Sequence, residues 1–410
     1  MEESVPKIKG AYLNYASTNA KKTGIFNPSD LTYPENVKAR DQYAILVDTI
    51  CRGVNAPVGS QVIINSGSTE SISNCIFWAK KYNPYGVIIG SDFDHSAVQE
   101  NSKVHSMNYK QMNLLDDDLI LKDNIAMIFL THVNSRTGEI FNMNTFSDHL
   151  ERYKYLQEED YHFTDKYLLQ YRPLVVLDVA QSIGKIPIDM EKWNVNALFF
   201  SLHKIGGPIG SGVLVIAPSI YSLPKFTPMI AGTQQGSLRG GTFPLNNIIN
   251  FDFNNVFKKY DKTSKRIARW KEVVDDIKKC GLEVYEPTHK HLYNTILINT
   301  HDKCPLAIIE ILAKKNIFVG NISACENERQ LQKEQEIDDV EINEEKDDVE
   351  KPWFIEEFDD PKNIEQPIAK LTGGIQPTDN YIRLSFKSAK EINEEVVDKI
   401  LRILVPIINL

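Results

Sequence analysis

One lysine in this sequence stands where an amine could become reactive. Lys204 follows the apolar run Ala197–Phe200 within Ser201-Leu-His203-Lys204, and a glycine-rich segment comes directly after it. Lysines are rarely buried, and removal from water lowers the pKa of the amine. A neutral amine is the nucleophile that forms a Schiff base with an aldehyde. Lys204 is therefore the first candidate for covalent chemistry.

A carboxylate ends another apolar run. Asp178 closes Leu174-Val-Val-Leu-Asp, and Gln181 follows three residues later. A carboxylate at the end of a buried strand is costly unless a cation meets it. A pyridinium N–H would serve, and so would an arginine or a helix cap. The residue by itself leaves these partners open.

Other polar segments follow apolar runs where strands are expected to end. The turn 66–69, Ser-Gly-Ser-Thr, could bind an anion at a helix N-terminus or could simply cap that helix. His95 and Asn134, taken singly, are typical of structural and turn positions. The glycine-rich loop Gly232–Thr242 could donate to a phosphate or form a surface turn.

The order of these segments resembles the class V aminotransferase family of the fold type I pyridoxal 5′-phosphate (PLP) enzymes. Within that family, it resembles the NifS-like cysteine desulfurases. The similarity extends over about residues 11–325 and 380–387. Its most specific parts are Asp178-Val-Ala-Gln181 and Ser201-Leu-His203-Lys204.

The resemblance implies a role for each residue at the cofactor ring. Lys204 would carry PLP as a Schiff base and later move the Cα proton of the substrate. Asp178 would pair with the pyridinium nitrogen, and Gln181 would bind the ring hydroxyl. His95 would stack on the ring face and take part in catalysis.

Further implied contacts concern the phosphate, the substrate and a second subunit. The phosphate site would be formed by Ser68, Thr69, Ser201 and His203. Thr242 would reach the phosphate of the neighbouring subunit, which implies a homodimer with shared sites. Arg383 would bind the substrate carboxylate, a task that suits a bidentate guanidinium. Asn134 would assist Arg383 and also contact the cofactor.

Cys325 lies in Asn321-Ile-Ser-Ala-Cys325, which resembles the Ser-Ala-Cys loop of the family. The resemblance implies that this cysteine attacks the sulfur of L-cysteine and carries it as a persulfide. L-alanine is then the product, and a sulfur acceptor or scaffold protein is the partner. Two alternatives stay open: another class V lyase, such as a selenocysteine lyase or a β-eliminating enzyme, and a degenerate PLP-fold protein that only binds partners.

Two stretches depart from the family pattern. Asn134-Ser135-Arg136 replaces the usual Asn-Asn-Glu, so the charge beside Asn134 is reversed. Ile322 stands in a loop that is usually glycine-rich, and a β-branched residue stiffens it.

Short runs rich in Val, Ile and Phe alternate with mixed segments between residues 60 and 220. This alternation predicts the buried strands of a mostly parallel sheet with helices between them. The expected fold class is α/β, of PLP fold type I, with a seven-stranded type of sheet and a smaller α+β C-terminal domain. Helices are expected over 70–81, 262–280 and 390–408, and a strand over 291–299.

The expected domain limits follow from these elements. The large PLP-binding domain should span residues 14–250, and residues 1–13 and 251–410 should form the small domain. Residues 326–365 hold 17 acidic and 5 basic residues, whereas the whole chain has a net charge of −9. We interpret 326–370 as an acidic, mobile insertion in the small domain.

Composition excludes several classes of protein. No basic stripe with interleaved aromatics is present, which argues against nucleic-acid binding. No apolar run is long enough to span a membrane. The first residues have neither signal- nor transit-peptide character. The five scattered cysteines form no CxxC pair, so no metal site is expected and the thiols should be reduced. A cytoplasmic protein is the resulting expectation.

Overall fold

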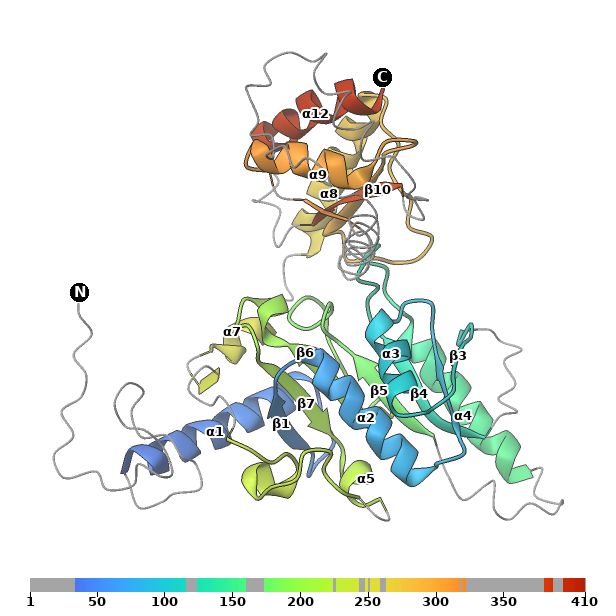
Figure 1. Ribbon diagram of the computed structural model, residues 1–410, viewed down its shortest axis with the longest axis vertical. Helices are drawn as coiled ribbons and strands as arrows, with labels where there is room; N and C mark the ends of the chain where they lie inside the picture. Colours follow the sequence, from blue (N-terminus) through green and yellow to red (C-terminus); the bar gives the residue numbers. More distant parts are fainter. Residues whose placement is uncertain are drawn as a thin grey trace, which may run out of the picture. The chain divides into compact units, whose positions relative to one another are not determined.

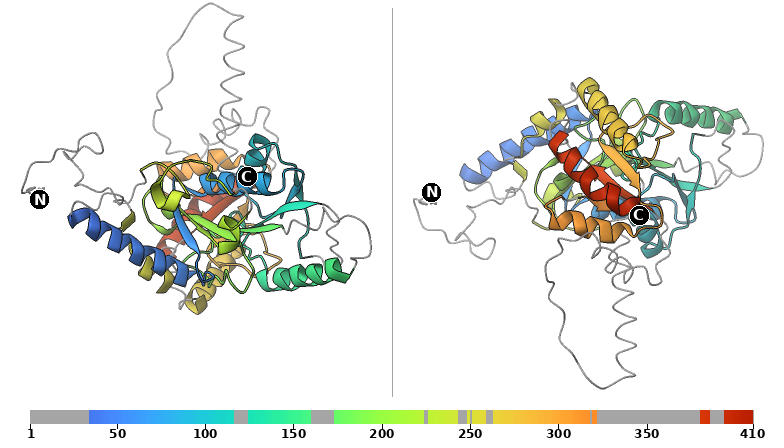
Figure 2. Two further views of the ribbon diagram at one scale, coloured as in Figure 1. Left: turned by 90° about the horizontal axis from the view of Figure 1, so that it is seen from below. Right: turned by 90° about the horizontal axis from the view of Figure 1, so that it is seen from above.

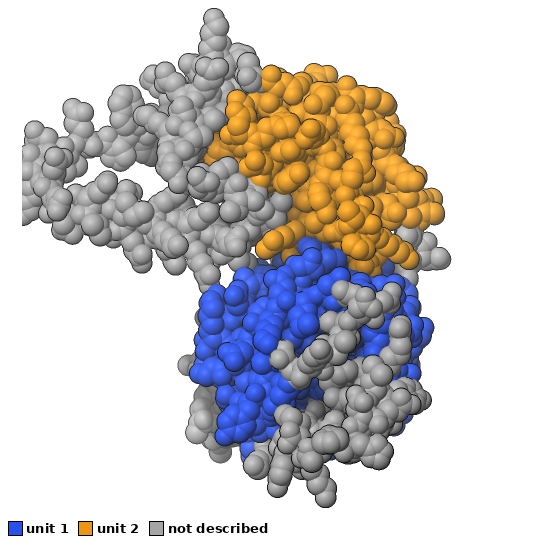
Figure 3. Space-filling model, turned by 90° about the vertical axis from the view of Figure 1, so that its right-hand side faces the viewer, with its two compact units in different colours: residues 1–134, 141–261 blue, residues 135–140, 262–410 orange. Residues whose placement is uncertain are grey.

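The structure is a computed structural model. It describes residues 34–115, 124–159, 173–223, 226–242, 248–249, 251–258, 263–317, 319–321, 380–385 and 394–409. The chain divides into two compact units, which Figure 3 distinguishes by colour. The first lies within residues 1–134 and 141–261, and the second within 135–140 and 262–410.

The first unit contains a seven-stranded sheet in the order β1-β7-β6-β5-β4-β2-β3. Strands β3, β2, β4, β5 and β6 run parallel, whereas β7 is antiparallel to both β6 and β1. The predicted mostly parallel sheet is therefore confirmed. The strands are β1 (Gln61–Asn65), β2 (Val87–Gly90), β3 (Tyr109–Gln111), β4 (Ile125–Thr131), β5 (Leu174–Asp178), β6 (Ala197–Ser201) and β7 (Gly212–Ile216).

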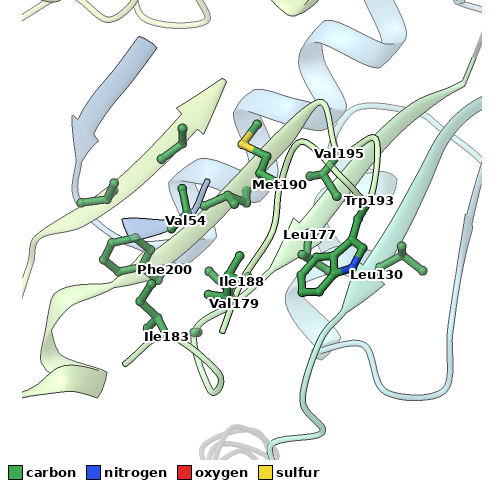
Figure 4. Close-up of a cluster of buried hydrophobic side chains, with 14 of the residues drawn as sticks. Val54, Leu130, Leu177, Val179, Ile183, Ile188, Met190, Trp193, Val195 and Phe200 are labelled. Carbon is green, nitrogen blue, oxygen red and sulfur yellow. The ribbon is translucent and has the colours of Figure 1, made fainter. Parts of the chain in front are cut away.

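Helices cover both faces of this sheet (Figure 1). Successive strand residues point to opposite faces, so Phe199 joins one apolar cluster and Phe200 the other. The Phe199 face packs against α2 (Ser68–Tyr82), α3 (Ser96–Val104) and α5 (Pro218–Tyr221). The Phe200 face packs against α1 (Pro34–Gly53), α4 (Met143–Glu159) and α7 (Phe253–Phe257). Part of this second cluster is drawn in Figure 4, with Phe200, Leu177 and Trp193 labelled. Burial on both faces explains why the central strands are continuous apolar runs.

The second unit is a small α+β structure. Its three-stranded antiparallel sheet has the order β8-β10-β9, with β8 (Thr295–Asn299), β10 (Tyr381–Ser385) and β9 (Gly320–Asn321). The sheet shares one apolar core with α8 (Thr263–Lys279), α9 (Pro305–Lys314) and α12 (Glu394–Ile408). Helices α9 and α12 lie side by side (Figure 2). Among the helices that the structure describes, none has the length and apolar character needed to cross a membrane.

The predicted elements are present with shifted ends. The helices expected over 70–81, 262–280 and 390–408 are α2, α8 and α12, of which α12 is described over Glu394–Ile408. The strand expected over 291–299 begins at Thr295.

Segment 135–140 belongs to the second unit, although the chain on both sides of it belongs to the first. Ile140 N donates to Lys290 O (2.7 Å), and Leu292 N donates to Gly138 O (2.9 Å). The expected limits of 14–250 and 251–410 place segment 135–140 in the large domain instead. A segment held by backbone hydrogen bonds has no apolar periodicity, so its sequence does not indicate that it packs with the second unit. Residues 1–13 and 326–370 lie outside the described residues.

Candidate active site

The carboxyl ends of the parallel strands bring the predicted residues of the first unit to one edge of the sheet. Asp178 ends β5, Ser201 ends β6, and Thr131 ends β4. Register places Thr131 beside Asp178, so their side chains lie on the same face of the sheet. His95, Asn134 and Lys204 follow the ends of β2, β4 and β6. Ligands of open α/β sheets bind at such an edge.

Asp178 is a buried carboxylate with few partners. The residue is 8% exposed, and Ala180 N donates to its Oδ1 (2.8 Å). Within the described part of the chain, no other hydrogen bond reaches this carboxylate. Burial raises the pKa of Asp178 to about 6, against the opposing effects of the Ala180 N–H and the positive charge of Lys204. A cationic ligand N–H would complete its environment.

Lys204 lies in η1 (Leu202–Ile205), a 3₁₀ turn that follows β6 directly. The turn ends at Gly206, whose φ of 84° lies in the left-handed region that glycine adopts readily. Lys204 is exposed, so the prediction that it is a buried strand-end residue is wrong. Strand β6 ends at Ser201, and the 3₁₀ turn carries the lysine beyond the sheet. Its charge still acts on Asp178, which places the two groups within electrostatic reach.

Two serines meet at the N-terminus of α2. The Oγ of Ser201 accepts a hydrogen bond from Ser68 N (2.9 Å) and lies 2.8 Å from Ser68 Oγ. The capping residue of α2 is Gly67, which has no side chain to satisfy the helix end. A Cβ on Gly212 would lie 2.5 Å from Gly67 Cα, so β7 can pass this turn only because both residues are glycine. A helix end of this kind suits an anion such as a phosphate.

The other two predicted phosphate ligands lie nearby in the chain. Thr69 is exposed in the first turn of α2, and His203 is exposed in η1 beside Lys204. Partial burial and the charge of Lys204 lower the pKa of His203. A neutral His203 would bind a phosphate as a hydrogen-bond donor rather than as a cation.

His95 is the N-cap of α3, which is a structural role. Its Nδ1 accepts a hydrogen bond from Ala97 N (3.1 Å). This bond assigns the lone pair to Nδ1, so the neutral ring carries its proton on Nε2. The ring is exposed and therefore remains accessible to a ligand. Capping and ligand contact are compatible in this geometry.

Gln181 and Asn134 are both half-buried. Lys185 Nζ donates to Gln181 Oε1 (3.3 Å) and to Gln181 O (2.8 Å). The amide oxygen is thus engaged, which leaves the NH₂ group to donate to a ring oxygen. Asn134 follows β4 and is the last residue of the first unit before segment 135–140.

The loop that ends at Thr242 is anchored beside the turn 66–69. Arg239 Nε pairs with Glu70 Oε1 (2.9 Å), and both side chains are largely buried. Gln235 accepts from Ile64 N (2.7 Å) and donates to Ile64 O (2.9 Å), so its amide pairs with the edge strand β1 as a strand residue would. Thr242 is exposed at the end of this loop. Neither anchor was predicted from the sequence, where the only indication is an arginine within a glycine-rich loop.

Arg383 lies in β10 of the second unit. Its Nη1 donates to Ser135 O (2.8 Å), and its Nε is buried without a partner. No carboxylate in the described part of the chain lies within ion-pair distance of it. Gly320 gives the guanidinium room, since a Cβ there would lie 3.1 Å from Nη2. A guanidinium with unused donors suits a carboxylate ligand. Cys325 lies outside the described residues.

Sequence similarity connects this sheet edge to a known family. The aminotransferase class-V family model matches residues 164–333, which include Asp178, Gln181, Ser201, His203 and Lys204. Residues 164–333, less than half of the chain, are similar to the class V aminotransferase family. The cofactor of this family is PLP. The carboxylate of Asp178, which has one donor in the described part of the chain, fits the ring nitrogen, and the N-terminus of α2 fits the phosphate.

The curated relatives of this chain are distant in sequence. Cysteine desulfurase IscS of Photorhabdus laumondii is 26% identical over 60% of this chain and 58% of its own length. Cysteine desulfurase IscS of Plasmodium falciparum is 25% identical over 48% of this chain and 35% of its own length. The match to IscS of Buchnera aphidicola subsp. Baizongia pistaciae is 24% identical and longer, with 77% of this chain and 80% of that protein.

Solved structures show the same fold. A NifS-like protein superposes with a TM-score of 0.65 at 18% identity, covering 93% of this chain and 91% of that one. A NifS-like protein from Rickettsia africae superposes with a TM-score of 0.64 at 17% identity, covering 94% and 92%. The predicted fold type I architecture is therefore confirmed.

Proposed function

We propose that this protein is a PLP-dependent cysteine desulfurase of the class V aminotransferase family. The proposed reaction converts L-cysteine to L-alanine and leaves a persulfide on Cys325. The observation that carries the proposal is the sheet edge where the poorly compensated carboxylate of Asp178 lies near Lys204. The substrate class follows from relatives named cysteine desulfurase, and a protein with this fold, SspA, was solved in complex with cysteine.

Each part of the cofactor has candidate partners in the first unit. Asp178 would hold the ring nitrogen, the NH₂ group of Gln181 would face the ring hydroxyl, and His95 would stack on the ring. The phosphate would be bound at the N-terminus of α2 by Ser68, Thr69, Ser201 and His203. When bound, PLP supplies an electron sink for bonds at the substrate Cα.

The residues of the chain would handle the proton, the carboxylate and the sulfur. The exposed amine of Lys204 is free to bind the aldehyde and to move the Cα proton. Arg383 and Asn134 would hold the substrate carboxylate. The thiolate of Cys325 would attack the substrate sulfur, so one C–S bond breaks and one S–S bond forms. L-cysteine and the Cys325 thiol thereby yield L-alanine and the Cys325 persulfide, whose outer sulfur passes to an acceptor protein.

A homodimer completes the proposal. Thr242 lies exposed at the end of a loop that the Arg239–Glu70 pair fixes. An exposed threonine in a fixed position is suited to complete a phosphate site in a second copy of the chain.

The reaction is tested by measuring alanine and sulfide released from L-cysteine in the presence of a thiol reductant. Cys325→Ser should retain bound PLP but release neither product at a significant rate. Cys304→Ser is the matched control, because Cys304 is a half-buried N-cap residue of α9 and should turn over normally. Normal turnover of Cys325→Ser would replace the desulfurase by a thiol-independent lyase. A wild-type protein that binds PLP but releases nothing would favour the degenerate binding protein.

A further inference from the structure

A second enclosed carboxylate lies at the same sheet edge, and the proposed reaction does not use it. Asp94 stands between β2 and α3, directly before His95. It accepts hydrogen bonds from Ser91 N (3.0 Å), Ser91 Oγ (3.2 Å), Tyr109 OH (3.1 Å) and Thr131 Oγ1 (2.9 Å). Part of the residue reaches the surface, but its carboxyl group is enclosed and burial raises its pKa to about 7.

The donors come from three neighbouring strands. Ser91 follows β2, Tyr109 begins β3 and Thr131 ends β4, and β2 lies between the other two in the sheet. A Cβ at Gly90 would lie 2.1 Å from Asp94 Oδ2, so the carboxylate occupies space that only glycine leaves open. Asp94 therefore ties the ends of β2 and β4 and the first residue of β3 to the turn that leads into α3.

This arrangement connects Asp94 to two residues proposed to contact the cofactor ring. His95 is its neighbour in the chain and the N-cap of α3. Thr131 is paired in register with Asp178, and both side chains lie on the same face. We propose that Asp94 is a positioning residue that orients the imidazole of His95 and, through Thr131, the strand end that carries Asp178.

Asp94 acts through its neighbours because its own oxygens are occupied. A carboxylate has about four lone-pair sites, and four donors already face this one. It is therefore poorly placed to accept a proton from a substrate. Loss of one acceptor would instead leave a donor unsatisfied and loosen the turn before His95.

The inference rests on the proposed function, and it is tested on the full-length holoenzyme. Asp94→Asn keeps the side-chain shape but replaces one acceptor oxygen by an NH₂ group. This NH₂ group would face hydrogen-bond donors and could not accept from them. The matched control is Asp92→Asn, because Asp92 is exposed and lies two residues earlier in the chain. The measurements are the visible circular dichroism of bound PLP, the Kd for PLP, and kcat and KM for L-cysteine.

We expect Asp94→Asn to lower kcat about tenfold, which corresponds to about 1.4 kcal/mol of activation free energy. The KM should change less than about twofold, because Arg383 binds the substrate carboxylate independently. The circular dichroism band should change and PLP should bind more weakly, whereas Asp92→Asn should match wild type in every measurement. Wild-type circular dichroism and kcat in Asp94→Asn would overturn the inference.

A second pair of variants covers the case in which Asp94→Asn does not fold. Thr131→Ser keeps the hydroxyl donor, and Thr131→Val removes it at nearly constant volume. Thr131→Val should show the altered circular dichroism and lower kcat, and Thr131→Ser should restore both. Equal behaviour of the two variants would overturn the inference. A wild-type enzyme without bound PLP or turnover would instead refute the proposed function.

Discussion

Replacement of Asp178 by asparagine should stabilise the cofactor-free protein while it removes activity. Burial raises the pKa of this carboxyl from 3.8 to about 6, because Ala180 N and the charge of Lys204 compensate it only partly. A folded-state pKa above the unfolded value means that folding disfavours the ionised form. The contribution of Asp178 to the stability of the cofactor-free protein is therefore fully present below pH 3.8 and is lost as the pH rises toward and through 6.

The size of this effect follows from the pKa difference. About two pKa units at 1.36 kcal/mol each correspond to about 3 kcal/mol at pH 7. Little of this is screened, because Asp178 is 8% exposed. Asparagine has the same shape, can accept from Ala180 N and carries no charge. Asp178→Asn should therefore raise the free energy of unfolding at pH 7 by up to about 3 kcal/mol, and by less than about 1 kcal/mol at pH 4.

The assay is urea unfolding of both cofactor-free proteins at the two pH values, with Asp92→Asn as the control for an exposed carboxylate. Saturating PLP should reverse the order of stability, because the ring nitrogen compensates the wild-type charge and not the amide. Turnover of Asp178→Asn should fall strongly. The reasoning is refuted if cofactor-free Asp178→Asn is less stable than wild type at pH 7, or if the difference does not depend on pH.

The remaining predictions concern Lys204, Thr242 and Arg383. After borohydride reduction, peptide mass spectrometry should find PLP on Lys204 of the wild type, and unmodified Lys204 in PLP-saturated protein would contradict the assignment. Mixed Thr242→Val and Lys204→Ala subunits should regain activity, because each heterodimer would have one site with both lesions and one with neither; no recovery despite subunit exchange would exclude shared sites. Arg383→Lys should raise the KM for L-cysteine about tenfold at unchanged PLP content, because lysine cannot bind a carboxylate in a bidentate manner; an unchanged KM would place the substrate carboxylate elsewhere.

The strands and the residues at their ends could be predicted from the sequence for one physical reason. A strand covered on both faces must be apolar throughout, so the first polar residue after the run marks its end. That rule locates Asp178 and the segment 201–204, and the structure brings both to one sheet edge. The same rule does not predict that Lys204 is exposed. The 3₁₀ turn after β6 depends on backbone hydrogen bonds and on Gly206, and apolar periodicity does not indicate it.

Contacts between distant parts of the chain were beyond prediction. Glu139 accepts hydrogen bonds from Thr288 N (2.9 Å) and Thr288 Oγ1 (3.2 Å), and these help to hold segment 135–140 in the second unit. The Arg239–Glu70 pair likewise joins a loop to the first turn of α2. Each pair combines polar residues that are common on surfaces, so only the fold shows that they meet.

Asp178 and Asp94 both lie at the sheet edge, and residue type alone does not distinguish the roles proposed for them. Asp178 has one hydrogen-bond donor in the described part of the chain, and Asp94 has four. Two of the donors to Asp94 stand 15 and 37 residues further along the chain, where no local pattern connects them to it. A carboxylate that its own protein saturates can fix neighbouring groups but has little capacity for a ligand. A buried carboxylate with one donor is unfavourable until a cationic ligand arrives, and this difference supports the proposals of positioning for Asp94 and cofactor binding for Asp178.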